Sequence, residues 1–113
     1  MRITTRHDDD ATRLVLTGDL DMATTAVLDD SVAAALTRPR PRRLVVDAEG
    51  LLFCDSSGIH ALMRARDRAQ RLGTSFVVAN PVGITRRTLE ITGLLDVLTT
   101  ATAPPASDES DGR

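Results

Sequence analysis

The chain has 113 residues, enough for one hydrophobic core and too few for a large active-site cleft with its own cofactor domain. Hydrophobic residues make up 42% of it, which excludes a disordered chain, and aromatic residues make up 2%, which leaves no stacking platform for single-stranded nucleic acid. The net charge of -2 lacks the basic excess of duplex-binding domains. We therefore expect no direct nucleic-acid partner.

The cysteine content and the distribution of apolar residues bear on location and cofactors. Cys54 is the only cysteine, so an internal disulfide and a four-thiolate metal site are excluded. Residues 1–10 lack the apolar run of a signal peptide, and no stretch reaches the roughly 18 apolar residues that span a bilayer. We expect a cytoplasmic protein without membrane contact, metal or cofactor.

Two strands and a helix are predicted in the first third of the chain. The β-branched, apolar run 12–17 is typical of a strand, and residues 3–6 pair with it as an antiparallel hairpin edge. The acidic triplet 8–10 is interpreted as the solvated turn between them rather than a cation site. A helix is predicted over residues 22–37, because apolar residues recur there at the spacing of one helix face. The residues of that face are Leu28, Val32 and Leu36.

Proline ends this first helix, and a buried strand follows. Asp21 or Thr24 is expected to cap the helix start, and the basic proline-rich segment 38–42 ends it, as a loop rather than a peptide-binding site. The continuous apolar run 44–46 predicts a strand buried on both faces, as in a parallel sheet. Residues 51–53 are expected to form a short connection.

A second helix is predicted from residue 55 to about 72, with Gly73 after its end. Its inner face consists of Ile59, Leu62, Ala65, Ala69 and Leu72. The arginines on its other side form either a solvated surface, which is favoured, or a docking surface for an acidic partner. They are Arg64, Arg68 and Arg71.

The last third contains a strand over 75–79 and a third helix that opens at Asn80-Pro81 and ends at Gly93. Residues 97–98 begin a final strand or a last helix, and a disordered acidic tail is expected from residue 101. The alternation of strands and helices predicts an α/β sandwich with a mostly parallel sheet.

The motif at residues 55–58, Asp-Ser-Ser-Gly, is the most informative about function. Small hydroxyl residues at a helix start are usually caps, worth about 1 kcal/mol. The free N–H groups and partial positive charge of a helix N-terminus also tolerate a phosphate, so an exposed serine there is a candidate modification site. The motif alone leaves both interpretations open.

Serine hydrolysis is the enzymatic alternative. Ser56 and His60 lie four residues apart, a spacing that lets them face each other on a helix. A nucleophile also needs an orienting carboxylate and an oxyanion pocket, and Asp55 is poorly placed to orient His60. We therefore expect a protein that is not an enzyme, with His60 on an interaction surface. Cys54 has no resolving thiol and is expected to be a packed thiol rather than a redox sensor.

The pattern resembles the STAS domain of the bacterial anti-sigma factor antagonists. The segments that carry the resemblance are Leu-Thr-Gly-Asp-Leu-Asp at 16–21, Leu-Val-Val-Asp at 44–47, Phe-Cys-Asp-Ser-Ser-Gly-Ile at 53–59, Asn-Pro at 80–81 and Leu-Glu-Ile-Thr-Gly-Leu at 89–94. The resemblance implies a STAS domain over residues 1–100, followed by the tail at 101–113. Its fold is an α/β sandwich with packed helices and a mostly parallel sheet of four or five strands with an antiparallel N-terminal edge.

The resemblance also implies a partner-switching function. In the family, the unphosphorylated antagonist binds an anti-sigma factor that is also a serine kinase, and thereby frees a sigma factor. Phosphorylation of the first serine of the motif, here Ser56, turns binding off, and a phosphoserine phosphatase resets the protein. The partner-binding residues expected here are Asp21, Asp55, Ser56, Ser57, Gly58 and His60. The alternative is a STAS scaffold or regulatory subunit of a transporter or signalling assembly, without a phosphoswitch.

Overall fold

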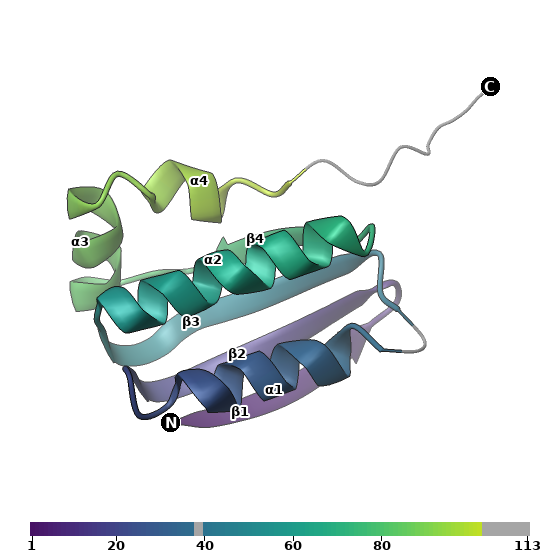
Figure 1. Ribbon diagram of the computed structural model, residues 1–113, viewed down its shortest axis with the longest axis horizontal. Helices are drawn as coiled ribbons and strands as arrows, with labels where there is room; N and C mark the ends of the chain where they lie inside the picture. Colours follow the sequence, from purple (N-terminus) through teal and green to yellow (C-terminus); the bar gives the residue numbers. More distant parts are fainter. Residues whose placement is uncertain (38–39, 103–113) are drawn as a thin grey trace.

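The computed structural model describes residues 1–37 and 40–102, which contain a four-stranded sheet in the order β1-β2-β3-β4 (Figure 1). The strands are β1 (Arg2–Asp8), β2 (Ala11–Leu20), β3 (Arg43–Cys54) and β4 (Ser75–Ala79). β1 pairs antiparallel with β2, and the β2–β3 and β3–β4 pairs are parallel. The predicted mostly parallel sheet with an antiparallel N-terminal edge is confirmed.

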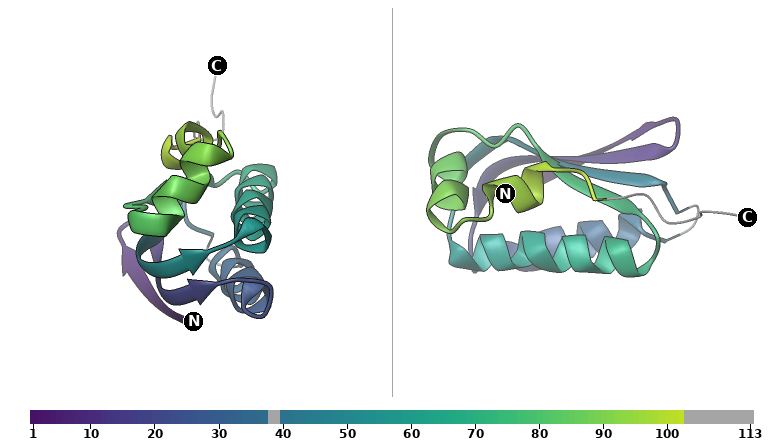
Figure 2. Two further views of the ribbon diagram at one scale, coloured as in Figure 1. Left: turned by 90° about the vertical axis from the view of Figure 1, so that its left-hand side faces the viewer. Right: turned by 90° about the horizontal axis from the view of Figure 1, so that it is seen from above.

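Four helices pack on this sheet within the described residues: α1 (Thr25–Ala35), α2 (Ser56–Arg71), α3 (Gly83–Ile91) and α4 (Leu95–Thr99). α1 and α2 lie side by side on one face of the sheet, and α3 and α4 lie on the side of β4 (Figures 1 and 2). Leucine, valine and alanine side chains fill the space between the sheet and the two long helices. The sequence offers only one aromatic residue, Phe76, to this core.

The predicted inner faces of the helices are buried. Leu28, Val32 and Leu36 are buried at α1, and Ile59, Leu62, Ala65 and Ala69 at α2, with Leu72 half-buried. Gly73 and Gly93 follow α2 and α3 with φ angles of 79° and 75°. Both glycines therefore adopt the left-handed conformation that is typical of the residue after a helix end.

β3 is longer than the sequence analysis predicted, because residues 51–53 continue the strand instead of forming a connection. β2 also continues to Leu20 and stays paired with β3 as far as Cys54, through two register shifts. Gly50 allows this close pairing, since a Cβ there would lie 2.7 Å from the carbonyl oxygen of Leu16. β4 pairs with β3 only as far as Asp47, so β2 and β3 project together beyond it.

α1 and α3 both begin later than predicted, for local reasons. Oδ1 of Asp21 accepts hydrogen bonds from the N–H of Ala23 at 3.0 Å and the hydroxyl of Thr24 at 3.2 Å, which forms a turn before α1. Thr24 then occupies the N-cap position without a capping bond from its side chain. Asn80 has a φ angle of 57°, and this left-handed backbone conformation is incompatible with a helix that begins at residue 80.

The described chain ends on the edge of β4. Residues 97–98 lie in α4, the helical one of the two predicted alternatives. Thr102 is buried, and its N–H donates to the carbonyl of Phe76 at 3.0 Å while its hydroxyl accepts from the N–H of Phe76 at 2.8 Å. The hydroxyl of Ser75 donates to the carbonyl of Thr102 at 2.8 Å. Thr102, the second residue of the expected tail, therefore packs on the domain, and residues 103–113 lie outside the described residues.

Candidate functional site

The motif at residues 55–58 lies where β3 passes into α2, at the end of the sheet where β2 also finishes (Figure 1). Leu20 is paired with Cys54, and the N–H of Asp55 donates to the carbonyl of Leu20 at 3.3 Å. Asp21 and Asp55 follow these two paired residues. The carboxylates predicted to contact a partner therefore stand on neighbouring loops.

Asp55, rather than either serine, caps α2. Its backbone is extended, with φ of -97° and ψ of -171°, and its Oδ1 accepts a hydrogen bond from the N–H of Gly58 at 3.0 Å. Its carbonyl accepts from the N–H of Ile59 at 3.0 Å. The interpretation of the motif hydroxyls as caps is therefore wrong, because the neighbouring carboxylate makes the capping bond.

The two serines of the motif differ in their access to solvent. Ser56 is exposed at the first position of α2, whereas Ser57 is half-buried at the second. Asp55 already uses the N–H groups of Gly58 and Ile59, so the first-turn donors outside these bonds are those of Ser56 and Ser57. A group attached to the Ser56 oxygen would project from the positive end of the helix dipole.

Gly58 is buried, so any part it has in partner binding is indirect. A Cβ at this position would lie 2.7 Å from the carbonyl oxygen of Leu20 and 2.8 Å from Sγ of Cys54. The absence of a side chain lets the first turn of α2 rest directly on the ends of β2 and β3. Glycine at position 58 therefore determines how closely the first turn of α2, which carries Ser56, approaches the ends of β2 and β3.

Cys54 is a packed thiol, as predicted. Its side chain is buried beneath the first turn of α2, and burial, followed by the charge of Asp55, raises the pKa of the thiol to about 11. It remains protonated at neutral pH and is a poor nucleophile. Within residues 1–37 and 40–102, no cluster of three His, Cys, Asp or Glu side chains is arranged to hold a metal ion.

His60 is exposed one turn along α2 from Ser56, and its place on an interaction surface stays a prediction. The carboxylate of Asp55 directs Oδ1 to the N–H of Gly58 instead of to His60. A serine nucleophile needs a base that is itself oriented by a third group. Asp55 does not fill that role, so this geometry lends the hydrolase alternative no support.

Exposed apolar side chains flank the motif, and the sequence analysis did not single them out. Met22 in the β2–α1 loop and Leu52 near the end of β3 are each 78% exposed, and Phe53 is 43% exposed. Val82 and Ile84, at the start of α3, are also exposed. Helix α3 stands at the same end of the molecule as the start of α2 (Figure 1). The pair Leu52 and Phe53, one residue before the motif, was the signal available in the sequence. Such side chains, rimmed by polar groups, are typical of a protein-binding surface.

Residues 3–100 match the family model described as Mlab, STAS domain. An anti-sigma factor antagonist from Mycobacterium paratuberculosis has a similar structure, with a TM-score of 0.75 and 24% identity over 88% of this chain and 82% of that one. The unphosphorylated anti-sigma factor antagonist SpoIIAA of Bacillus aligns with a TM-score of 0.71 and 18% identity over 83% of each chain. A sulfate transporter family protein from Wolinella succinogenes gives 0.69 and 12% over 92% and 78%. At these identities the structural likeness shows the fold. None of the described helices has the length and apolar character needed to span a membrane.

Proposed function

The chain belongs to the STAS domain family, and we propose that it acts as an anti-sigma factor antagonist controlled by phosphorylation of Ser56. In this proposal the unphosphorylated protein binds an anti-sigma factor with serine kinase activity and frees a sigma factor in the bacterial cytoplasm. Phosphorylation of Ser56 by that kinase ends the contact, and a phosphoserine phosphatase restores it. The protein acts by binding and performs no catalysis.

The exposure of Ser56 is the observation that carries the proposal. A kinase must reach the hydroxyl of its substrate, and Ser56 is exposed while Ser57 is half-buried. Asp55 makes the capping bond of α2, so modification of Ser56 removes no bond that holds the helix start. Phosphorylation is therefore compatible with an intact fold.

The apolar side chains near the motif supply the affinity in this proposal. Met22, Leu52 and Phe53 are exposed within a few residues of Asp21 or Asp55, which gives an apolar surface with a polar rim. Burial of apolar surface contributes about 25 cal/mol per Å² before the costs of association. A partner seated on these side chains would also cover Ser56.

The phosphate would act at the interface rather than on the fold. At the start of α2 its charge of about -1.5 to -2 meets free N–H groups and the helix dipole, a contact worth about 0.3 to 1 kcal/mol. Inside a packed interface the same charge must lose its hydration and repels acidic groups of the partner. The solved structures of SpoIIAA in unphosphorylated and phosphorylated form lend support from a protein of this fold, with TM-scores of 0.71 and 0.65.

The second candidate is a STAS scaffold or regulatory subunit without a phosphoswitch. The likeness to a sulfate transporter family protein favours it, because the same fold serves in that setting. The two candidates differ at Ser56, which a scaffold would leave unmodified. Kinase-dependent incorporation of phosphate therefore separates them.

The test uses the purified protein and a cytosolic extract of its own source with labelled ATP. We expect phosphate incorporation into the unchanged chain and into Ser57→Ala, and none into Ser56→Ala, because Ser56 presents the accessible hydroxyl. Phosphopeptide mapping identifies the labelled residue. Label on Ser57, or equal labelling of both variants, would contradict the assignment, and absence of label from the unchanged chain would favour the scaffold.

A further inference from the structure

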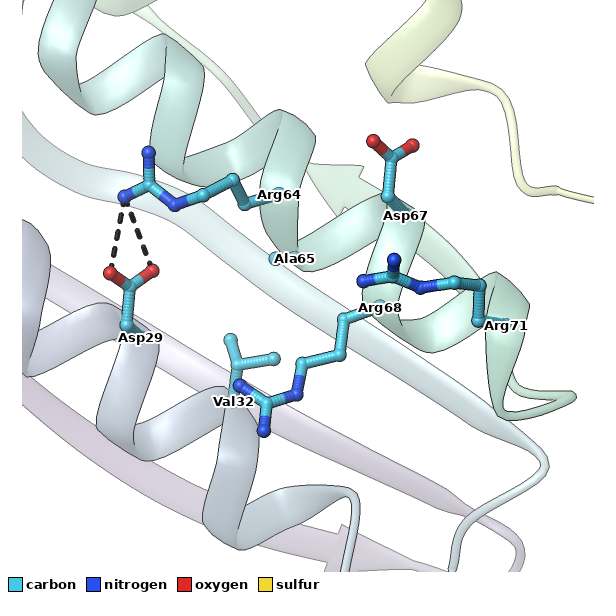
Figure 3. A pocket seen from close by; sticks show the side chains of 7 residues that line it. All are labelled: Asp29, Val32, Arg64, Ala65, Asp67, Arg68 and Arg71. Atoms are coloured by element: carbon cyan, nitrogen blue, oxygen red, sulfur yellow. Dashed lines mark hydrogen bonds and ion pairs between the residues drawn. The ribbon is translucent and has the colours of Figure 1, made fainter.

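A groove of about 490 Å³ separates α1 from α2 on the outer side of the two helices (Figure 3). The groove is lined by the apolar side chains of Val32 on α1 and Ala65 on α2, and by charged side chains that include the arginines of α2. The groove extends toward the C-terminal half of α2, whereas Ser56 opens the N-terminal turn. It is therefore a second surface, separate from the candidate site for the kinase.

The charges of this groove are incompletely balanced. Arg64 is paired with the carboxylate of Asp29 on α1, at 3.1 and 3.3 Å. Arg68 extends across the groove toward α1, Arg71 runs back along α2 at its edge, and the carboxylate of Asp67 points away from α1 (Figure 3). Within the part of the chain that the structure describes, the ion pairs do not include Arg68 or Arg71. Two guanidinium groups are thus available to an anionic occupant.

The described chain ends near the C-terminal turn of α2, on the side of that helix that faces away from α1 (Figures 1 and 2). Thr102 is hydrogen-bonded to Ser75 and Phe76, at the start of β4. Ser75 follows Arg71 by four residues, so their Cα atoms are at most about 15 Å apart. A chain that continues from Thr102 therefore starts close to the C-terminal turn of α2.

The sequence beyond Thr102 has the complementary charge. Three carboxylates fall within four residues, and they belong to Asp108, Glu109 and Asp111. Asp108 follows Thr102 by six positions, and an extended chain over six positions spans about 20 Å. This reach exceeds the separation between Ser75 and Arg71.

We propose that the acidic segment 108–111 of this chain docks in the α1–α2 groove, with its carboxylates on Arg68 and Arg71. The planar guanidinium group of arginine matches a carboxylate in a two-point hydrogen bond. The tether gives the segment an effective concentration on the order of millimolar, so weak contacts suffice. An acidic segment of another protein would meet the same chemistry but would first have to displace the tethered one.

The direct test places a nitroxide spin label on the full chain through Ser110→Cys. Cys54 is buried with a raised pKa, so the introduced thiol is the one that reacts. Broadening of amide signals should be concentrated in the second half of α2 and the facing turn of α1. It should be lost at high salt and in the double variant Arg68→Glu/Arg71→Glu. The matched control Arg86→Glu/Arg87→Glu, which reverses two exposed charges on α3, should retain it. Absent, uniform or charge-independent broadening would overturn the proposal.

A competition experiment distinguishes the tether from an external partner. An added oligoglutamate peptide is titrated into the full chain and into the full-length variant Asp108→Asn/Glu109→Gln/Asp111→Asn. Docking of the tether predicts binding about tenfold tighter to the neutralised variant, because its groove is open. Equal affinity for the two proteins would assign the groove to an acidic partner and contradict docking of segment 108–111.

Discussion

Gly58 occupies a point in the first turn of α2 where the neighbouring strands leave no room for a side chain. A Cβ there would lie within 2.9 Å of the Leu20 carbonyl oxygen, the Leu20 side chain and the Cys54 sulfur. The Leu20 carbonyl is backbone, so it cannot rotate away as a flexible side chain would. The position of α2 against β2 and β3 therefore depends on glycine at this residue.

We predict that Gly58→Ala lowers the free energy of unfolding by about 1 to 3 kcal/mol, the usual range for overpacking. The direction is opposite to that of most glycine-to-alanine changes within helices, which stabilise by up to about 1 kcal/mol. Urea unfolding measures the difference, and Ser57→Ala, one residue earlier in the same turn, is the control. A Gly58→Ala protein as stable as the control would contradict the close packing described above.

Cys54 should dominate the pH dependence of the free energy of unfolding between pH 9 and pH 11. The thiol ionises near pH 9 in the unfolded chain, whereas burial and then the charge of Asp55 raise its pKa to about 11 in the folded protein. The raised pKa contributes stability that is complete below pH 9 and is lost as the pH rises through 11. The sequence contains no lysine and no tyrosine, so few other groups titrate in this window.

The free energy of unfolding should therefore fall by roughly 2 kcal/mol between pH 9 and pH 11 in the unchanged protein. Cys54→Ala lacks the titrating group, so its stability should vary much less over the same range, although below pH 9 it is less stable than the unchanged protein because a cavity remains. Denaturant unfolding at several pH values gives both profiles. Two parallel profiles would show that Cys54 is not the cause.

At the scale of the elements, local sequence signals and long-range pairing determined different parts of the fold. The apolar spacing of Leu28 and Val32, and the glycines after α2 and α3, were sufficient to predict helices and their ends. The extension of β3 over residues 51–53 was not predictable, because it depends on pairing with β2, more than thirty residues earlier. The start of α1 depends on hydrogen bonds that one side chain, that of Asp21, accepts.

The features of the candidate site are likewise of two kinds, those that local sequence predicts and those that depend on long-range pairing. The motif and its resemblance to the STAS family predicted where Ser56 would lie, because helix starts follow local sequence. The packing role of Gly58 and the exposure of Leu52 were not predicted. Both depend on which residues β2 and β3 bring to the end of the sheet, and no local pattern encodes that.

The pairing of Thr102 with β4 leads to a prediction about where the domain ends. A chain that stops after residue 100 loses three hydrogen bonds between Thr102 and residues 75–76, whereas one that stops after residue 102 keeps them. Hydrogen bonds of this kind contribute about 0.5 to 1.5 kcal/mol each. We expect the shorter protein to melt several degrees lower, as measured by circular dichroism. Equal melting temperatures would show that the β4 edge does not need Thr102.

The exposed apolar surface near the motif leads to a prediction about binding. Leu52→Asp should leave the melting temperature nearly unchanged, since the side chain is 78% exposed, but should weaken partner binding more than tenfold. Ile91→Asp, at a residue 77% exposed at the far end of α3, is the control and should bind normally. Calorimetric titration compares the two variants. Similar loss of affinity in both would remove the apolar surface at the end of β3 from the proposed interface.

At the scale of the whole molecule, the proposed function requires a rigid domain whose surface changes while its fold does not. The sheet, α1 and α2 form one core beneath the motif, and Ser56 lies outside that core. A charge added at Ser56 therefore has no buried partner to disrupt within the described residues. The consequence of phosphorylation should be confined to the contact with the partner.

The decisive measurement is the affinity of the proposed partner, an anti-sigma factor with kinase activity, for the unmodified and the Ser56-phosphorylated protein. Desolvation and repulsion of the phosphate that remove about 3 kcal/mol of binding free energy would weaken the complex more than a hundredfold. We predict a loss of that size by calorimetric titration, with the same melting temperature for both forms and full binding by Ser56→Ala. Equal affinity of the two forms, or unfolding of the phosphorylated one, would contradict the account.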